Sequence, residues 1–205
     1  MIHLNGHILC AIDIETTGLD PKVHEIYEIA IIPLKGDLKP DPTIRPLDIL
    51  IKPDNDTDID WAGMSKTGNK DVVHNALMRG TDKFTAADYI VEWFEKINLP
   101  ESKRLVPLAQ NWAGIDKIFI TEWLGPLTFE QIFHFHYRDT MTTALYINDR
   151  ADAHNERIPF PKVNLQYLCS QLGIERNGRA HRALDDALVV AEVYKKLLTY
   201  QLHTI

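Results

Sequence analysis

The hydrophobic period of the sequence changes after residue 52, and this change constrains the fold more than any other feature. Residues 8–14, ILCAIDI, form a continuous apolar run of the kind found in buried strands. A second strand is predicted over Ile26 to Ile32, and the alternation of Leu47, Ile49 and Ile51 with their neighbours predicts a third strand with one buried face. Three strands in succession predict an antiparallel meander.

Helical spacing dominates the rest of the chain. From Phe84 to Ile97 the apolar residues recur at helical intervals, which predicts a helix, and Thr85 with Asp88 matches a capping box. Phe84 and Tyr89 are placed for a hydrophobic staple at its start. A further strand is predicted over residues 104–110, followed by helices over Ile115 to Leu124, Leu165 to Leu172 and Leu184 to Leu198. This order of elements predicts a mixed α/β fold.

Length and charge limit the classes of protein to which the chain can belong. Its 205 residues suit a single domain over residues 1–205, with an elaborated, acidic segment around residues 53–80. No stretch without Asp, Glu, Lys or Arg exceeds twelve residues, and the N-terminus does not resemble a signal peptide. We therefore expect a cytoplasmic chain without membrane contact. The net charge of −7 argues against a protein that coats DNA non-specifically, but not against an enzyme that pairs carboxylates with metal ions.

The acidic pair Asp13 and Glu15 is the first sign of chemistry. Residues two apart on a strand project from the same face, so both carboxylates are expected at one place, at the end of a buried strand. Like charges there repel each other and resist desolvation, so a divalent metal with oxygen ligands is the simplest compensating cation. The alternative is that the strand has already left the core and that both acids are solvated loop residues.

Three segments together resemble a known family. Residues 13–20, DIETTGLD, are followed by a second strand that carries HEIYEIA. Residues 111–116, NWAGID, place an Asn five positions before an Asp, and residues 181–186, HRALDD, match the pattern HxAxxD. In this order, over residue 8 to about residue 198, the segments resemble the three motifs of the DnaQ-like exonucleases, DEDDh subgroup.

The resemblance implies an RNase H-like fold, in which helices flank a mixed sheet made of an antiparallel meander plus parallel strands. It also implies metal-dependent removal of nucleotides from the 3′ end of a nucleic acid. Asp13, Glu15, Asp116 and Asp186 would bind two Mg²⁺ or Mn²⁺ ions, and His181 would be the general base. The chemistry agrees, because phosphodiester hydrolysis needs charge neutralised on both the attacking and the leaving side, and Mg²⁺ prefers carboxylate oxygens.

Further residues are candidates for substrate contacts. Thr16 and Thr17 offer backbone or hydroxyl contacts to the terminal nucleotide, and Asn111 helps to shape the site. Trp112 stands where the family usually has a small residue and could either stack on a base or shape the pocket. Ile115 replaces a common Phe. These departures concern substrate preference and leave the set of acids intact.

Arginines gather around His181. Arg176, Arg179 and Arg182 lie within seven residues, next to the expected place of a substrate phosphate, and Arg suits phosphate contacts. The alternative is an ordinary solvated loop before a helix.

Two adjacent acids, Asp185 and Asp186, are candidates for the fourth carboxylate ligand of the metal site. At about 100° per residue, Asp185 would share a face with His181 if both lay on one helix, whereas Asp186, which the family pattern names, would lie about 140° away. The family pattern is consistent with helix geometry only if His181 precedes the helix. Asp186 then faces the sheet, and Asp185 points elsewhere.

We expect a metal-dependent 3′-to-5′ exonuclease that releases nucleoside monophosphates from single-stranded ends. The third motif and the AEVY helix that follows it resemble proofreading members, which favours DNA, and an exoribonuclease of the same family is the alternative. A hypothesis from another class is a catalytically silent domain that binds nucleic acid or a replication or repair protein. The complete set of four acids and one His argues against silence. Motif spacing does not reveal contacts to a 2′-OH, the oligomeric state or a protein partner.

Overall fold

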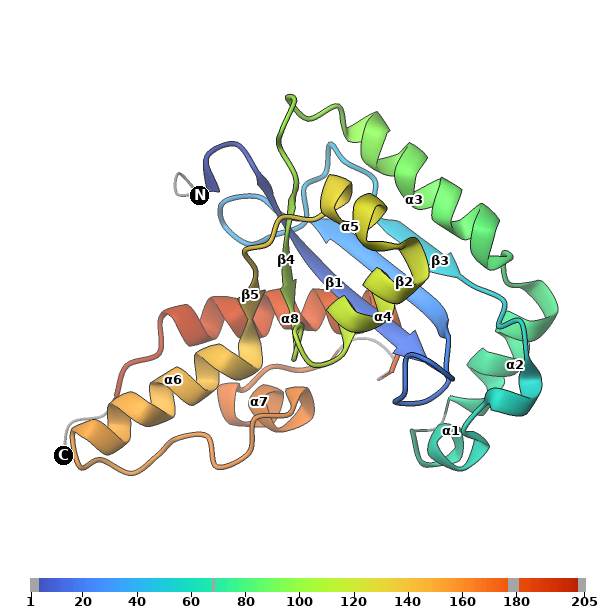
Figure 1. Ribbon diagram of the computed structural model, residues 1–205. Coiled ribbons are helices and arrows are strands. Elements are labelled where there is room, and N and C mark those ends of the chain that lie inside the picture. The colour runs from blue at the N-terminus through green and yellow to red at the C-terminus, as the bar shows by residue number, and fades with distance from the viewer. Residues whose placement is uncertain (1–3, 68, 177–180, 203–205) are drawn as a thin grey trace.

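The computed structural model describes residues 4–67, 69–176 and 181–202. Within them, five strands form one mixed sheet in the order β3-β2-β1-β4-β5 (Figure 1). The antiparallel part consists of β1 (Ile8–Thr16), β2 (Ile26–Pro33) and β3 (Leu47–Leu50). The parallel part adds β4 (Leu105–Ala109) and β5 (Arg138–Asp139) on the other side of β1. The predicted meander and the predicted strand over residues 104–110 are confirmed, and β5 is an addition.

Helices cover both faces of this sheet (Figure 1). One face carries α3 (Lys83–Ile97), α4 (Asp116–Leu124) and α5 (Pro126–Ile132). The other face carries α8 (Ala183–Leu198), which in turn packs against α6 (Thr140–Ala153) and α7 (Leu165–Leu172). Ala183, Ala187 and Ala191 recur every four residues on the sheet-facing side of α8. Their small side chains allow the helix to lie close to the sheet.

The start of α3 differs from the sequence prediction. Its N-cap is Asp82, whose carboxylate accepts hydrogen bonds from the backbone of Phe84 at 3.2 Å and of Thr85 at 3.0 Å. The predicted capping box at Thr85 is therefore wrong, because a better acceptor precedes it. The staple is wrong as well, since the side chains of Phe84 and Tyr89 are 73% and 48% exposed.

The elaborated segment around residues 53–80 is folded. It contains a 3₁₀ turn, η2 (Asp56–Asp58), and two helices, α1 (Trp61–Thr67) and α2 (Lys70–Arg79). These helices bury Met64, Val73 and their neighbours against Tyr27 of β2. After α2 the chain returns to the edge of β3, where Thr81 exchanges backbone hydrogen bonds with Leu50 and Lys52. None of the described helices is both long and apolar enough to cross a membrane.

We predict that Gly80→Ala destabilises the fold. Gly80 follows α2 where its backbone touches β3, and a Cβ there would lie 2.5 Å from the carbonyl oxygen of Ala76 and 2.6 Å from the nitrogen of Lys52. Backbone atoms cannot move aside cheaply, so we expect a loss of about 1–3 kcal/mol in unfolding free energy, measured by urea denaturation.

Gly63→Ala is the matched control, because a Cβ at this position of α1 would approach only the carboxylate of Asp60, which can rotate. Ala also favours helix over Gly. Equal stability of the two variants would contradict the close packing of Gly80.

Candidate active site

Strand β1 delivers two carboxylates to one face of the sheet. Ile12 and Ile14 of β1 pack beneath α3, α4 and α5, whereas Leu9 and Ala11 pack beneath α8. Because side chains alternate along a strand, Asp13 and Glu15 project toward α8. The expected common face of this acidic pair is confirmed, and the solvated-loop alternative is wrong, because both residues belong to β1 and are partly buried.

Two helix N-termini bring the remaining acids to the same end of the sheet. Asp116 is the first residue of α4, and Asp186 lies in the first turn of α8. Their exposed fractions are only 3% and 7%. A helix N-terminus favours a negative charge, which offsets part of the cost of burying each carboxylate. Backbone N–H groups, including that of Ile14 at the end of β1, also lower the pKa of Asp116 and so oppose part of the effect of burial.

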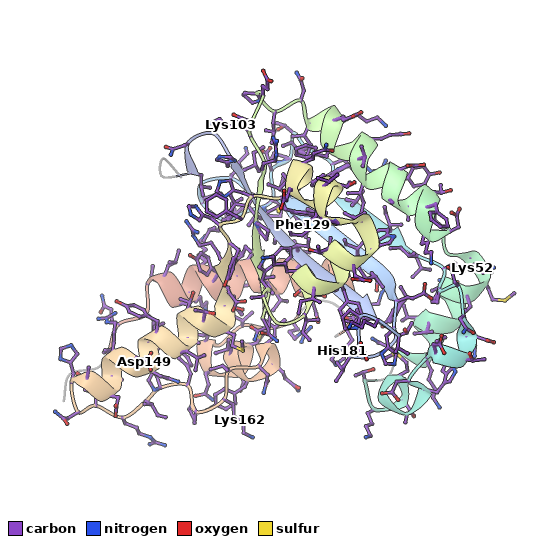
Figure 2. All side chains as sticks on the ribbon, viewed as in Figure 1. Lys52, Lys103, Phe129, Asp149, Lys162 and His181 are labelled. Atoms are coloured by element: carbon purple, nitrogen blue, oxygen red, sulfur yellow. The ribbon has the colours of Figure 1, made fainter. Side chains whose placement is uncertain are left out.

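His181 stands immediately before α8, whose N-cap is Arg182. Its backbone adopts a left-handed conformation with φ of 62°, and its N–H donates to Oδ2 of Asp186 at 3.3 Å. Figure 2 shows the exposed His181 side chain near the end of the sheet. Ligand atoms of His181, Glu15 and Asp186 lie within 4.8 Å of one another. The prediction that His181 precedes the helix is confirmed, and Asp186 is buried while Asp185 is half-exposed.

Burial and neighbouring carboxylates disfavour the ionised forms of Asp13, Glu15 and Asp116. Burial, followed by the charges of Glu15 and Asp116, raises the pKa of Asp13 well above its usual range. Burial also raises the pKa of Glu15 to about 8, with a further contribution from Glu28, and that of Asp116 to about 8. Burial, followed by the charge of Arg176, lowers the pKa of His181, which therefore stays neutral at neutral pH.

Two arginines compensate part of this charge. The guanidinium of Arg176 forms an ion pair with Oδ1 of Asp186. Arg182 binds both carboxylate oxygens of Glu28 through Nε, at 2.9 and 3.1 Å, and Oε1 through a terminal nitrogen at 2.8 Å. Glu28 is 1% exposed and lies opposite Glu15 in the strand register. The sequence analysis missed Glu28, although it stands in the quoted segment HEIYEIA and the strand pairing could have indicated it.

The substrate contact of Arg182 stays a prediction, and the structure gives this arginine a second, structural role. Its guanidinium is held by a buried carboxylate, which would lose its partner if the arginine turned toward a phosphate. Arg179 lies outside the described residues.

The hydroxyls of the threonines after Glu15 are used within the hairpin. Thr17 is 2% exposed, its N–H donates to the carbonyl of Glu25 at 2.8 Å, and its Oγ1 accepts from the N–H of Glu25 at 2.9 Å. Its carbonyl accepts from the N–H of Asp60 at 2.8 Å. The expected substrate contact of Thr17 is thus corrected to a role in closing the β1–β2 connection. Thr16 donates its hydroxyl to the carbonyl of Gly18 at 2.7 Å and remains half-exposed.

Trp112 belongs to the core. Its side chain is 1% exposed and lies against Phe129 and Phe133, with ring centroids 6.2 and 6.0 Å away. A buried indole offers no face to a base, so the stacking hypothesis is wrong. The backbone N–H of Trp112 instead donates to Oδ2 of Asp139 at 2.6 Å, which attaches the 110–115 turn to the start of α6.

A cavity of about 530 Å³ opens beside the acids. Asn111, with φ of 63°, lines it together with Asp13 and Asp116. The opposite wall comes from α6 and from the start of α7, through Met141 and Leu165. This volume falls within the range of ordinary small-molecule pockets, about 300–1,000 Å³.

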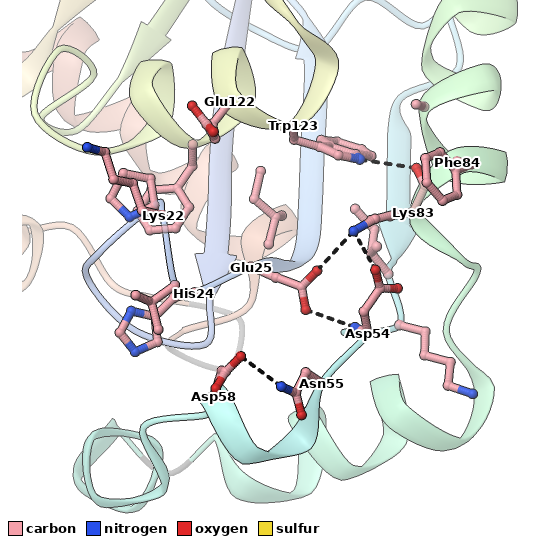
Figure 3. A pocket seen from close by; sticks show the side chains of 17 residues that line it. Lys22, His24, Glu25, Asp54, Asn55, Asp58, Lys83, Phe84, Glu122 and Trp123 are labelled. Carbon is pink, nitrogen blue, oxygen red and sulfur yellow. Dashed lines mark hydrogen bonds and ion pairs between the residues drawn. The ribbon is translucent and has the colours of Figure 1, made fainter.

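A second cavity, of about 440 Å³, lies between the β1–β2 connection and the start of α3 (Figure 3). Several of its polar groups bind one another: Lys83 pairs with Asp54 and, at 3.6 Å, with Glu25, while Asn55 donates to Asp58 at 2.8 Å. None of the four candidate acids lines it. The pairs of Lys83 join three segments of the fold.

We predict that, without divalent ions, the stability of the fold falls as the pH rises. In an unfolded chain Glu15 and Asp116 titrate near pH 4, whereas in the fold their pKa is about 8. Between these values the unfolded chain binds fewer protons than the folded one, so a higher pH favours unfolding. In EDTA we expect a lower Tm at about pH 8.5 than at about pH 5.5, and Mn²⁺ should raise the Tm mainly at the higher pH.

Asp13→Asn should raise the Tm in EDTA at the higher pH, because it removes one of the repelling charges. Asp149→Asn removes an exposed charge of α6 and serves as the control. A Tm in EDTA that increases between the two pH values would contradict this electrostatic account.

Comparisons with known proteins place the chain in a family. A family profile described as "RNase_T: Exonuclease" matches residues 10–194. The chain is 30% identical to an oligoribonuclease of Leifsonia xyli subsp. xyli, over 86% of this chain and 75% of the relative. It is 27% identical to a DNA polymerase III subunit epsilon of Rickettsia felis, over 91% of this chain and 72% of the relative.

Solved structures agree on the fold. The nuclease domain of 3′hExo, a DEDDh family member bound to rAMP, is similar with a TM-score of 0.66 and 19% identity, over 94% of this chain and 92% of that chain. E. coli exonuclease I in complex with a dT13 oligonucleotide is also similar with a TM-score of 0.66 and 19% identity, but this chain spans only 41% of its length. Because the family profile covers most of the sequence, the chain belongs to the DnaQ-like (DEDDh) family of 3′-to-5′ exonucleases, with the RNase H-like fold.

Proposed function

We propose that the chain hydrolyses the terminal phosphodiester at the 3′ end of single-stranded nucleic acid and releases a nucleoside monophosphate. One observation carries this proposal: β1, α4 and α8 bring four carboxylates to one end of the sheet, next to His181. Carboxylates that repel one another when buried are costly for stability, so their convergence points to chemistry.

The donor set fits hard divalent cations. DEDDh family nucleases use divalent metal ions, and the four acids offer the oxygen ligands that such ions prefer. For Asp13, Glu15 and Asp116, burial and neighbouring carboxylates raise the pKa, so a bound cation would stabilise their ionised forms. We propose that Asp13, Glu15, Asp116 and Asp186 hold two Mg²⁺ or Mn²⁺ ions. When bound, such ions neutralise charge on the attacking and leaving oxygens of the phosphodiester.

His181 is proposed to take the proton of the attacking water. Its lowered pKa keeps the imidazole neutral and able to accept a proton, and its exposed side chain is accessible to solvent. The backbone hydrogen bond to Asp186 holds the residue beside the acids without using the ring.

The cavity next to Asp13 and Asp116 is the proposed place of the terminal nucleotide. Asn111 shapes its wall. Half-exposed Thr16, the last residue of β1, is a proposed contact to the same nucleotide. The apolar contribution of Met141 and Leu165 suits a base or sugar, while the acids lie where the phosphate must approach the metal ions.

Two kinds of nucleic acid, DNA and RNA, are candidates for the substrate. DNA is the first, because the third motif resembles proofreading members and relatives named DNA polymerase III subunit epsilon match 91% of the chain. RNA is the second, because the relatives that are 30% identical include oligoribonucleases. Discrimination requires a contact to the 2′-OH, which an assay with both sugars reports directly.

The test is to incubate the purified chain with Mg²⁺ or Mn²⁺ and with single-stranded DNA and RNA labelled at either end. We expect stepwise shortening of 5′-labelled strands, immediate release of labelled mononucleotide from 3′-labelled strands, and complete inhibition by EDTA. Cleavage from the 5′ end or inside the strand would contradict the proposal. Binding of the strands without any cleavage would instead identify a catalytically silent binding domain.

The assignment of Asp186 over Asp185 gives a separate prediction. Asp186→Asn removes a carboxylate that faces the site and should lower metal-dependent turnover by at least ~100-fold. Asp185→Asn is the matched control and should retain most activity, because its half-exposed side chain lies outside the group formed by Glu15, His181 and Asp186. An inactive Asp185→Asn beside an active Asp186→Asn would show that the motif is misaligned by one residue.

His181→Ala should bind metal and substrate normally but turn over ~10²–10⁴-fold more slowly, because it removes the proposed general base.

A further inference from the structure

Asn69 occupies a helix cap but does not act as one. It is the N-cap residue of α2, a position where Asn normally accepts a hydrogen bond from the first turn, yet its side chain makes no such bond. The residue is 1% exposed. Its Nδ2 donates to the hydroxyl of Tyr27 at 2.8 Å and to Oε2 of Glu15 at 3.3 Å. Its Oδ1 is buried and finds no partner among the described residues. Asn69 makes no capping hydrogen bond and leaves its buried Oδ1 without a partner among the described residues, while its Nδ2 binds two groups outside the helix. This arrangement indicates a role outside α2.

Tyr27 completes the same network. Its side chain is fully buried, and its hydroxyl donates to Oε2 of Glu15 at 3.3 Å while accepting from Asn69. Two donors therefore converge on one oxygen of Glu15, which determines how the carboxylate is rotated.

We propose that Asn69 and Tyr27 are positioning residues that hold Glu15 through Oε2, so that the carboxylate is oriented for the divalent ion. This inference rests on the proposed function, because it assigns Glu15 to the metal.

The proposal gives the elaborated segment a function. The helices pack on Tyr27 through Met64 of α1 and through Val73 of α2, and the segment is attached a second time where the N–H of Asp60 donates to the carbonyl of Thr17. The first attachment is to the residue of β2 that donates to Glu15, and the second is to the residue two positions after Glu15 in the chain. The α1–α2 pair thereby supports the Glu15 carboxylate from outside the sheet.

The test measures Mn²⁺ binding by calorimetry, without nucleic acid, for the wild type, Tyr27→Phe, Asn69→Leu and the double variant. We expect about 10-fold weaker Mn²⁺ binding for each single variant and up to about 100-fold for the double variant. The Mn²⁺ concentration for half-maximal nuclease activity should rise in parallel, while the KM for the oligonucleotide at saturating Mn²⁺ stays unchanged.

Asn148→Leu is the matched structural control. Asn148 is also a buried amide, and it binds the backbone of Phe160 at 2.7 and 2.9 Å, far along α6. This variant should lose stability but keep wild-type Mn²⁺ affinity. Tyr27→Phe removes a single hydroxyl and preserves the apolar packing, so it carries the test if Asn69→Leu does not fold.

The outcomes separate this inference from the proposed function. A folded Tyr27→Phe with wild-type Mn²⁺ affinity would overturn the positioning role, even if the wild type degrades oligonucleotides. Weaker Mn²⁺ binding in the variants together with a wild type that degrades no oligonucleotide would support the positioning role and overturn the proposed function.

Discussion

The mutual repulsion of carboxylates at one end of the sheet is the constraint on which the rest of the structure depends. Asp13 and Glu15 share a face of β1, and Asp116 and Asp186 arrive beside them from two helices. Such a group is tolerated only where partial positive charge and hydrogen-bond donors surround it. The N-termini of α4 and α8, the backbone of Ile14 and the arginines before α8 supply both.

The segment that enters α8 links charge compensation to geometry. Arg182 is the N-cap of α8 and binds buried Glu28 of β2, so the helix start is attached to the strand that neighbours β1. The residue before it, His181, adopts a left-handed backbone whose N–H reaches Asp186. One short stretch thus places the proposed base, fixes a proposed metal ligand and neutralises an acid that the chemistry does not use.

The elements predicted from sequence were those with a strong period. The three N-terminal strands and the helices now seen as α3, α4, α7 and α8 follow from long apolar patterns, to within one or two residues. The helices α1, α2, α5 and α6 were missed, because their buried faces are small or partly polar and so carry a weak apolar period. The longest of them, α6, buries Thr140 and Asn148 beside its apolar residues. Strand β5 is two residues long and exists only because β4 lies beside it. Trp112 could not be assigned to the core, since its burial depends on α5, which was not predicted.

The sequence by itself determined which residues are the candidates for the chemistry and in what order they occur, because the residues of each motif are close along the chain and their spacing encodes strand and helix faces. It placed Asp13 and Glu15 on one face, and it separated Asp186 from Asp185 through the geometry of a helix that begins after His181. Only the tertiary structure decided how each charge is compensated. Glu28 meets Arg182 across 154 positions of sequence, and Asn69 meets Glu15 across 54. Such contacts depend on how helices pack onto strands and leave no periodic trace in the sequence, so packing alone assigned Thr17 to the hairpin, Trp112 to the core and Asn69 to the support of Glu15.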